Sequence, residues 1–114
     1  MHMNVEQVLI RKLGEAGRLA YADVPNPMPA SFVTVERAGG GDRDFVDRAS
    51  IAVQCWADGR KAAADMADEV RKELEAMTGE DGLGAVTVQS VYNWPDTRAR
   101  KARYQMTVGV VAHI

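Results

Sequence analysis

The order of hydrophobic patterns along the chain restricts its fold more than any single motif. Residues 4–16 and 58–77 carry apolar side chains at the i, i+3, i+4, i+7 spacing of amphipathic helices. Five segments rich in β-branched and aromatic residues are predicted strands: 19–24, 31–37, 50–56, 85–94 and 102–112. The order α-β-β-β-α-β-β has too many consecutive strands for a repeated βαβ fold. It predicts an α+β domain, a mostly antiparallel sheet of about five strands with two helices packed on one face.

Local signals set the ends of these elements. Asn4 can cap the first helix, and Gly17 can stop it. Three prolines in residues 25–29 remove backbone donors, so residues 19–24 should form an edge strand followed by a stiff, extended connection. The glycines of residues 38–42 predict a flexible loop after the second strand. Residues 95–101 are polar and predict a second loop.

Alternation along the strands predicts which side chains are buried. Ile51, Val53 and Cys55 share one face of their strand, which we expect to be the core face. Trp56 lies on the opposite face, which favours a position in an interface. Trp94 shares its parity with the apolar residues of its own strand, so we expect it to pack inside.

Composition and charge bound the class of protein. The 114 residues fit one domain, 1–114, with no linker or repeat. There is no long apolar run and no signal-peptide pattern, so we expect no membrane partner. The net charge of −2 argues against wholesale neutralisation of a nucleic-acid backbone, and we expect no sequence-specific nucleic-acid partner. One cysteine and two histidines predict neither a disulfide nor a metal or other cofactor.

The charges are unevenly distributed. Residues 58–81 hold eight acids against four bases, whereas residues 96–103 hold four bases against Asp96 alone. Separated patches of this kind are either ordinary solvated faces or surfaces that steer one subunit onto another.

No catalytic pattern is found. Gly39-Gly40-Gly41 is followed by Asp42-Arg43-Asp44 and a strand, not by the lysine, hydroxyl and helix of a phosphate loop. Cys55 has no paired base in the sequence pattern, and His2 and His113 lie near the termini. We expect the protein not to be an enzyme.

Several segments carry a family resemblance that covers nearly the whole chain. They are residues 21–29, residues 32–37 with the following glycines, residues 51–57 with the alanine-rich helix after them, and residues 103–108. Together they resemble the small tail terminator (tail completion) proteins of long-tailed phages and actinobacterial prophages.

This resemblance implies a structural role without catalysis or cofactor. Such a protein forms a hexameric ring on the head-proximal end of the tail tube, ends tube polymerisation and joins the tail to the head. It implies three partners: further copies of this chain, the tail tube protein and the head connector protein. The location is the virion tail, after assembly in the host cytoplasm.

Two loops, residues 39–47 and 96–101, are the expected contacts, because long polar loops are uncommon in compact domains unless they are used. With Trp56 added, the candidate contact residues are Gly39, Gly40, Gly41, Asp42, Arg43, Asp44, Phe45, Trp56, Arg98, Arg100 and Lys101.

Three alternatives remain at this point. A head-side adaptor or stopper of the connector would also be small and oligomeric. A ligand-binding α+β domain would use a pocket between sheet and helices, although the predicted inward positions are almost all apolar. A small enzyme would need a nucleophile, base or metal set that the sequence lacks.

Overall fold

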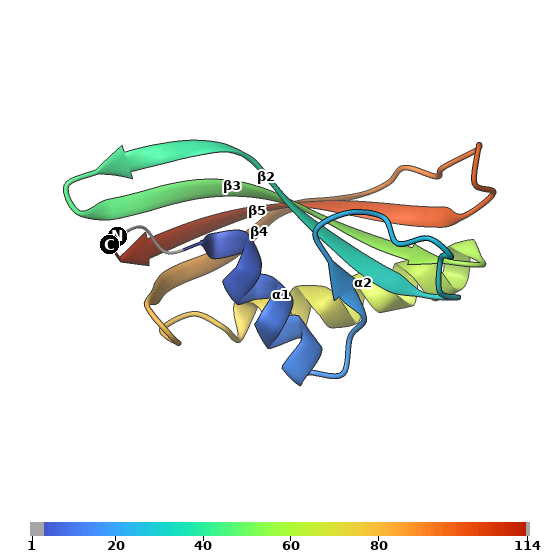
Figure 1. Ribbon diagram of the computed structural model, residues 1–114, viewed down its shortest axis with the longest axis horizontal. Coiled ribbons are helices and arrows are strands. Elements are labelled where there is room, and N and C mark those ends of the chain that lie inside the picture. Colours follow the sequence, from blue (N-terminus) through green and yellow to red (C-terminus); the bar gives the residue numbers. More distant parts are fainter. Residues whose placement is uncertain (1–3, 114) are drawn as a thin grey trace.

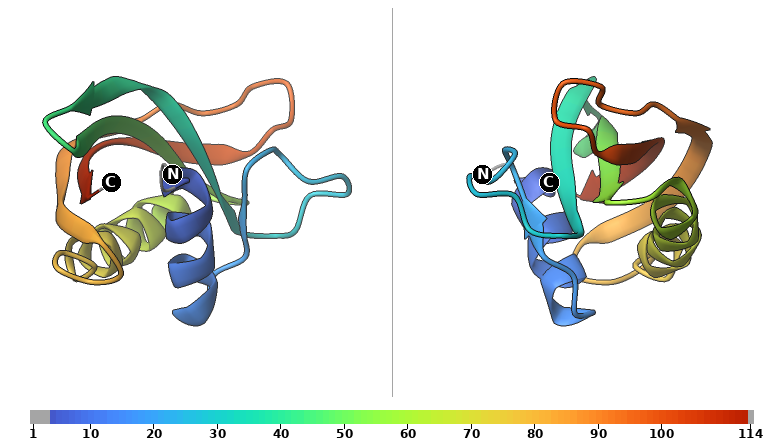
Figure 2. Two further views of the ribbon diagram at one scale, coloured as in Figure 1. Left: turned by 60° about the vertical axis from the view of Figure 1, so that its left-hand side comes forward. Right: turned by 90° about the vertical axis from the view of Figure 1, so that its right-hand side faces the viewer.

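The computed structural model describes residues 4–113 and has the predicted order of elements. The helices and strands are α1 (Val5–Glu15), β1 (Ala20–Tyr21), β2 (Phe32–Arg43), β3 (Val46–Ala57), α2 (Arg60–Glu75), β4 (Leu83–Asn93) and β5 (Ala102–His113). One five-stranded sheet has the order β1-β2-β3-β5-β4, and every pair is antiparallel except β1 with β2. Both helices lie on the same side of the sheet (Figure 1, Figure 2), so the predicted fold class is confirmed.

Helix α1 begins and ends where the sequence signals predict. The side chain of Asn4 accepts a hydrogen bond from the backbone N–H of Gln7 at 3.2 Å, which satisfies one of the unpaired amides of the first turn. At the other end Gly17 has φ +95°, and the N–H of Arg18 returns to the carbonyl of Leu13 at 2.9 Å. The buried face of the helix packs against β1 and β2.

The core lies between the two helices and the inner face of the sheet. Helix α2 buries one stripe of apolar residues against β3, β4 and β5: Ala63, Met66, Ala67, Val70 and Leu74. From the sheet, Ile51, Val53 and Cys55 point into the same core, as the alternation predicted. Burying each large aliphatic side chain contributes about 1.5–3 kcal/mol. No helix within residues 4–113 is both long and apolar enough to cross a bilayer.

The first predicted strand is shorter than expected. Only Ala20 and Tyr21 pair with β2, and they do so in parallel. The segment 22–31 that follows contains no helix or strand, as its prolines predicted.

The prediction of a loop over residues 38–42 is wrong, because these residues continue β2. The glycines allow an irregular strand instead of a loop: a β-bulge lies between Arg37 and Gly39, and Gly40 has φ +107°, which glycine adopts without strain. Antiparallel pairing with β3 then continues to Arg43 and Val46. The connection is a two-residue turn, Asp44-Phe45, at the end of a long hairpin.

The prediction that Trp94 packs inside is also wrong, since its side chain is 48% exposed. Strand β4 carries a second irregularity between Val88 and Ser90, which breaks the alternation on which the prediction relied. Beyond Val88, β4 has no buried residue.

Candidate assembly interface

The sheet face that points away from the helices is called the outer face here. Strand alternation places on it the residues between the core positions, such as Gln54 of β3 and Gln105 of β5. The two ends of this face differ.

At one end the outer face is closed by an aromatic stack. The rings of Phe32 and Trp56 are parallel within 13°, with centroids 5.2 Å apart. The guanidinium of Arg103 lies between two indoles, 4.8 Å from the Trp56 centroid and 4.5 Å from that of Trp94. The indole N–H of Trp56 donates to Thr34 Oγ1 at 3.1 Å. Trp56 is therefore on the predicted face but only 2% exposed, which corrects its expected place in an interface.

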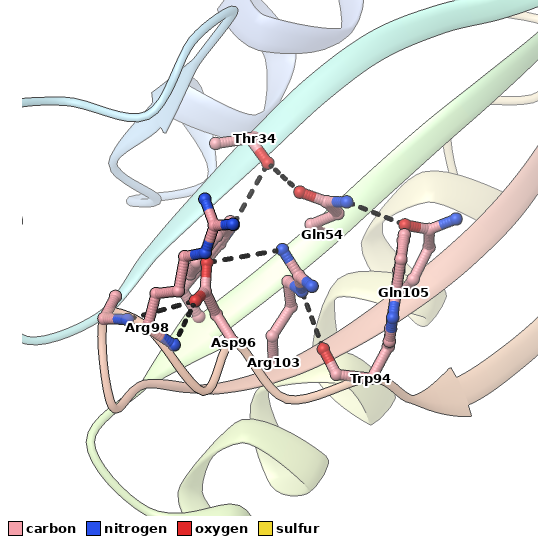
Figure 3. Close-up of polar contacts among 9 residues, drawn as sticks. Thr34, Gln54, Trp94, Asp96, Arg98, Arg103 and Gln105 are labelled. Atoms are coloured by element: carbon pink, nitrogen blue, oxygen red, sulfur yellow. Dashed lines mark hydrogen bonds and ion pairs between the residues drawn. The ribbon is translucent and has the colours of Figure 1, made fainter.

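A polar ladder of four side chains runs beside this stack, one from each of β2, β3, β5 and β4. Thr34 Oγ1 donates to Gln54 Oε1 at 3.1 Å, and Gln54 Nε2 donates to Gln105 Oε1 at 2.7 Å. Gln105 Nε2 in turn bonds to the Tyr92 hydroxyl at 2.6 Å. The four residues are directly opposite one another in the strand register. Figure 3 shows Thr34, Gln54 and Gln105 in line across the sheet.

The basic loop, residues 96–101, is held by Asp96. Its carboxylate accepts the backbone N–H groups of Arg98 and Ala99, both at 3.0 Å, and lies 3.8 Å from the guanidinium of Arg103 (Figure 3). The hydrogen bond from the Ala99 amide is the main cause of a lowered pKa of Asp96. The side chains of Arg98 and Arg100 are exposed and form no ion pair with any residue of 4–113. The loop thus presents two unpaired cations on an ordered turn.

Lys101 serves its own chain. Its ammonium donates to the carbonyls of Pro29 and Ala30 at 3.1 and 3.0 Å and pairs with the Asp58 carboxylate. Its side chain is only 10% exposed. Lys101 therefore ties the basic loop to the proline-rich segment and to the start of α2.

The acidic stretch is matched by bases of the same chain. Arg18 contacts both Glu69 and Glu73, at 2.9 and 2.7 Å, and Lys12 contacts Glu80 and Asp81, both at 2.8 Å. The remaining four acids of residues 58–81 also have partners: Asp58 with Lys101, Asp65 with Lys61, Asp68 with Lys72, and Glu75 with Arg71. The charge asymmetry seen in the sequence is thus largely balanced within the fold.

The other end of the sheet carries the β2–β3 hairpin. Phe45 at its turn is 85% exposed, although it is a large apolar residue. Asp44 and Phe45 have φ +53° and +63°, a left-handed conformation that costs a residue with a Cβ atom about 1–2 kcal/mol. The hairpin itself is firmly held, because Arg37 binds the buried Asp47 through two nitrogens, each at 2.7 Å.

Within the part of the chain that the structure describes, the titratable groups give no positive sign of catalysis or metal binding. Cys55 is buried, and burial raises the pKa of its thiol to about 12, which disfavours the nucleophilic thiolate. Within residues 4–113 no group of three or more His, Cys, Asp or Glu side chains could hold a metal ion. His113 is exposed at the end of β5, and His2 lies outside the described residues.

The predicted contact residues therefore divide into two distant groups. The hairpin turn and the basic loop lie at opposite ends of a molecule 43 Å long, which Figure 1 shows at its left and right sides. Sequence reasoning missed the roles of Arg103, Gln54 and Gln105. Their signal is present, since all three have outward parity on β3 or β5, but it depends on a strand register that only the structure gives.

The sheet order and the two helices on one face define an α+β fold that also occurs among solved structures. No protein-family model and no curated protein matches the sequence. Among solved structures, a chain described as part of the virion of the native gene transfer agent particle matches with a TM-score of 0.65. The sequences are 16% identical, and the match covers 98% of this chain and 89% of that one. The two chains share a fold over nearly their whole lengths.

Proposed function

We propose that the protein is a structural component of a phage-like virion and works by assembling with other protein subunits. The observation that carries this proposal is the fold shared, end to end, with a chain of the gene transfer agent virion. Because folds host many functions, the surfaces must also suit assembly. Here they do, since the exposed Phe45 ring lies at one end of an elongated subunit and the exposed Arg98 and Arg100 lie at the other.

More specifically, we propose a tail terminator: a ring, taken to be a hexamer, on the head-proximal end of the tail tube. The sequence resemblance supplies this assignment, together with the tail tube protein and the head connector as partners. A ring joins two different surfaces of each subunit. The Phe45 turn and the exposed Arg98 and Arg100 lie at opposite ends of the molecule, so one end can serve a contact between subunits and the other a contact with the tube or the connector. No reaction, cofactor or metal belongs to the proposal.

The first experiment measures the mass of the purified protein by light scattering over a range of concentrations, alone and after mixing with isolated tail tubes. A mass near six subunits, or a ring bound to the tube end, supports the terminator role. Binding to portal-bearing capsids instead of tubes assigns the chain to the head side, as an adaptor or stopper. A monomer that binds neither contradicts the virion role.

A second experiment concerns the basic loop. The double variant Arg98→Glu, Arg100→Glu reverses the two unpaired cations, and we expect it to weaken binding to the tube or the connector by at least about tenfold at low salt. Lys101 is left in place because it holds the loop to its own chain. The matched control, Lys61→Glu with Lys72→Glu, makes the same charge change on α2. Equal binding by both double variants would remove the basic loop from the proposed contact.

A further inference from the structure

The Phe45 turn combines two unfavourable features that a free surface does not explain. The phenylalanine ring is almost wholly in water, and the backbone under it is left-handed, where glycine or asparagine is the ordinary choice for a two-residue hairpin turn. Strained, exposed residues of this kind persist where they serve a contact. The phenyl group is therefore presented to solvent at the end of the sheet.

A hollow that suits such a ring lies on the outer face of the sheet. It measures about 360 Å³, and we call it the glycine groove; it is lined by Gly40, Arg48, Ser50, Thr87, Gln89 and Gly109. The strand register explains why the groove exists. Gly39, Ser50, Gly109 and Thr87 stand opposite one another on β2, β3, β5 and β4, so small side chains, or none, cross four strands in one row.

The turn cannot reach the groove of its own chain. Val46, directly after the turn, pairs with Arg43 on one side and with His113 of β5 on the other. This double pairing holds the turn at the end of the sheet and prevents it from folding back over Arg48. An occupant of the groove must come from another molecule.

The charges around the turn and the groove are complementary. Asp44 lies in the turn beside Phe45, whereas Arg48 lies on the groove and is exposed, without an ion pair among residues 4–113. An aspartate beside an inserted ring would meet this guanidinium at a partly desolvated site, where such a pair adds register and specificity.

We infer that the Phe45 turn of one copy inserts into the glycine groove of a second copy. The contact joins two different surfaces of the same chain, and so it repeats from subunit to subunit until a ring closes. The inference rests on the proposed function, because it supplies the contact between the subunits of the proposed ring.

The variant Phe45→Gly tests the inserted phenyl group while keeping the fold intact. Glycine removes the side chain and relieves the left-handed strain, so the thermal midpoint should stay equal or rise. We expect self-association to weaken by at least about tenfold, the loss typical of a central aromatic anchor. Trp94→Ser is the matched control, because it removes an exposed aromatic at the far end of the molecule. A Phe45→Gly protein that assembles like wild type would overturn the inference.

Gly109→Ala tests the groove from the other side. The added Cβ would come within 2.6 Å of the Gln89 side-chain nitrogen, the end of a flexible side chain that can move into the hollow. Folding should therefore change little while the groove becomes smaller, and association should weaken at least about threefold. Unchanged association with the groove filled would contradict the inference.

Cross-linking identifies the two surfaces directly. The variants Arg43→Cys and Thr87→Cys are made with tags of different mass and mixed under mild oxidation. A mixed disulfide is expected, because Arg43 precedes the turn and Thr87 lines the groove. The native Cys55 is buried and does not compete. The control pair, Arg98→Cys with Thr87→Cys, should give no mixed product.

The two proposals fail in different ways. Rings that form and bind tubes without the mixed disulfide, and with Phe45→Gly active, disprove the inserted turn and leave the terminator role intact. Mixed disulfides in a protein that binds no tube support the contact and contradict the terminator. Wild-type protein that stays monomeric, with and without tubes, overturns both.

Discussion

The two halves of the outer face, which no helix covers, differ in how their strands are shielded from solvent. In the aromatic half, large side chains from distant segments cover the strands: Phe32, Trp56, Arg103 and Trp94 in one row and the polar ladder beside it. In the glycine half, the row through Gly39 and Gly109 offers almost no side chain, and a hollow remains. The first half is closed by the chain itself, and the second is left for another molecule. The same four strands run through both halves, with bulges in β2 and β4 between them, and the two halves differ most in the size of their outward side chains.

The largest expected effect comes from opening the closed half. Trp56→Ala removes a buried ring, its stacking on Phe32 and its hydrogen bond to Thr34. We expect a loss of about 4 kcal/mol in the free energy of unfolding, measured by urea denaturation. Trp94→Ala, which removes a half-exposed indole, should cost about 1 kcal/mol. If the two variants lose the same stability, the aromatic half is not closed by the chain in the way described.

A nearly equal loss of stability should come from adding one carbon atom to the glycine half. At Gly40 a Cβ would lie 1.9 Å from the carbonyl oxygen of Arg48, and φ is +107°. Because backbone atoms cannot move aside cheaply, Gly40→Ala should cost about 3 kcal/mol. Gly41→Ala is the matched control: nothing lies within 4 Å of the new Cβ, and φ is not in the left-handed region. It should be neutral or stabilise by up to about 1 kcal/mol through the unfolded state. Similar midpoints for both variants would argue against the bulged path of β2.

A smaller effect should follow from breaking the polar ladder. Gln105→Ala removes the central acceptor of the Gln54 amide and the partner of the Tyr92 hydroxyl. We expect a cost of about 1–2 kcal/mol, since partly buried polar groups lose their partners. Thr107→Ala, the neighbouring outward position on β5, has no ladder contact and should change stability by less than about 0.5 kcal/mol. Equal costs would mean that the ladder contributes no more than any outward side chain.

Local periodicity was sufficient to predict the fold class, and long-range contacts explain where prediction failed. The 3.6 and 2.0 periods identified both helices and the alternation of Ile51, Val53 and Cys55, because those patterns lie within single elements. Trp94 was misplaced because one extra residue in β4 breaks the alternation. Trp56 was on the predicted face, but its cover comes from Arg103, a partner 47 positions further along the chain.

The candidate contacts show the same limit. Lys101 was read as a free cation, yet its partners lie more than 40 residues earlier in the chain, at Pro29, Ala30 and Asp58. The glycines of β2 were read as a loop, since glycine permits positive φ in a strand bulge as readily as in a turn. Phe45 was expected to make a contact from a loop over residues 39–47; the structure places it, exposed, in the two-residue turn of the hairpin, and its contact stays a prediction.

The smallest expected effect concerns the basic loop that borders the aromatic half. The amides of Arg98 and Ala99 donate to the Asp96 carboxylate, and these bonds lower the pKa of Asp96 below its ordinary value of 3.8. The folded loop thus favours the ionised form. Its contribution is fully present above the ordinary pKa and is lost as the pH falls through the lowered value. The amide proton shifts of Arg98 and Ala99, followed by NMR from pH 6 downward, should titrate together with a midpoint below 3.8. Asp96→Asn keeps an acceptor without the charge, and in that variant the transition should vanish. A midpoint at or above 3.8 would show that the loop is ordered by the contacts of the Lys101 side chain with Pro29, Ala30 and Asp58 and not by the ionised Asp96. In that case the loop would be held by the rest of the fold, and the positions of the exposed Arg98 and Arg100 would not depend on the charge of Asp96.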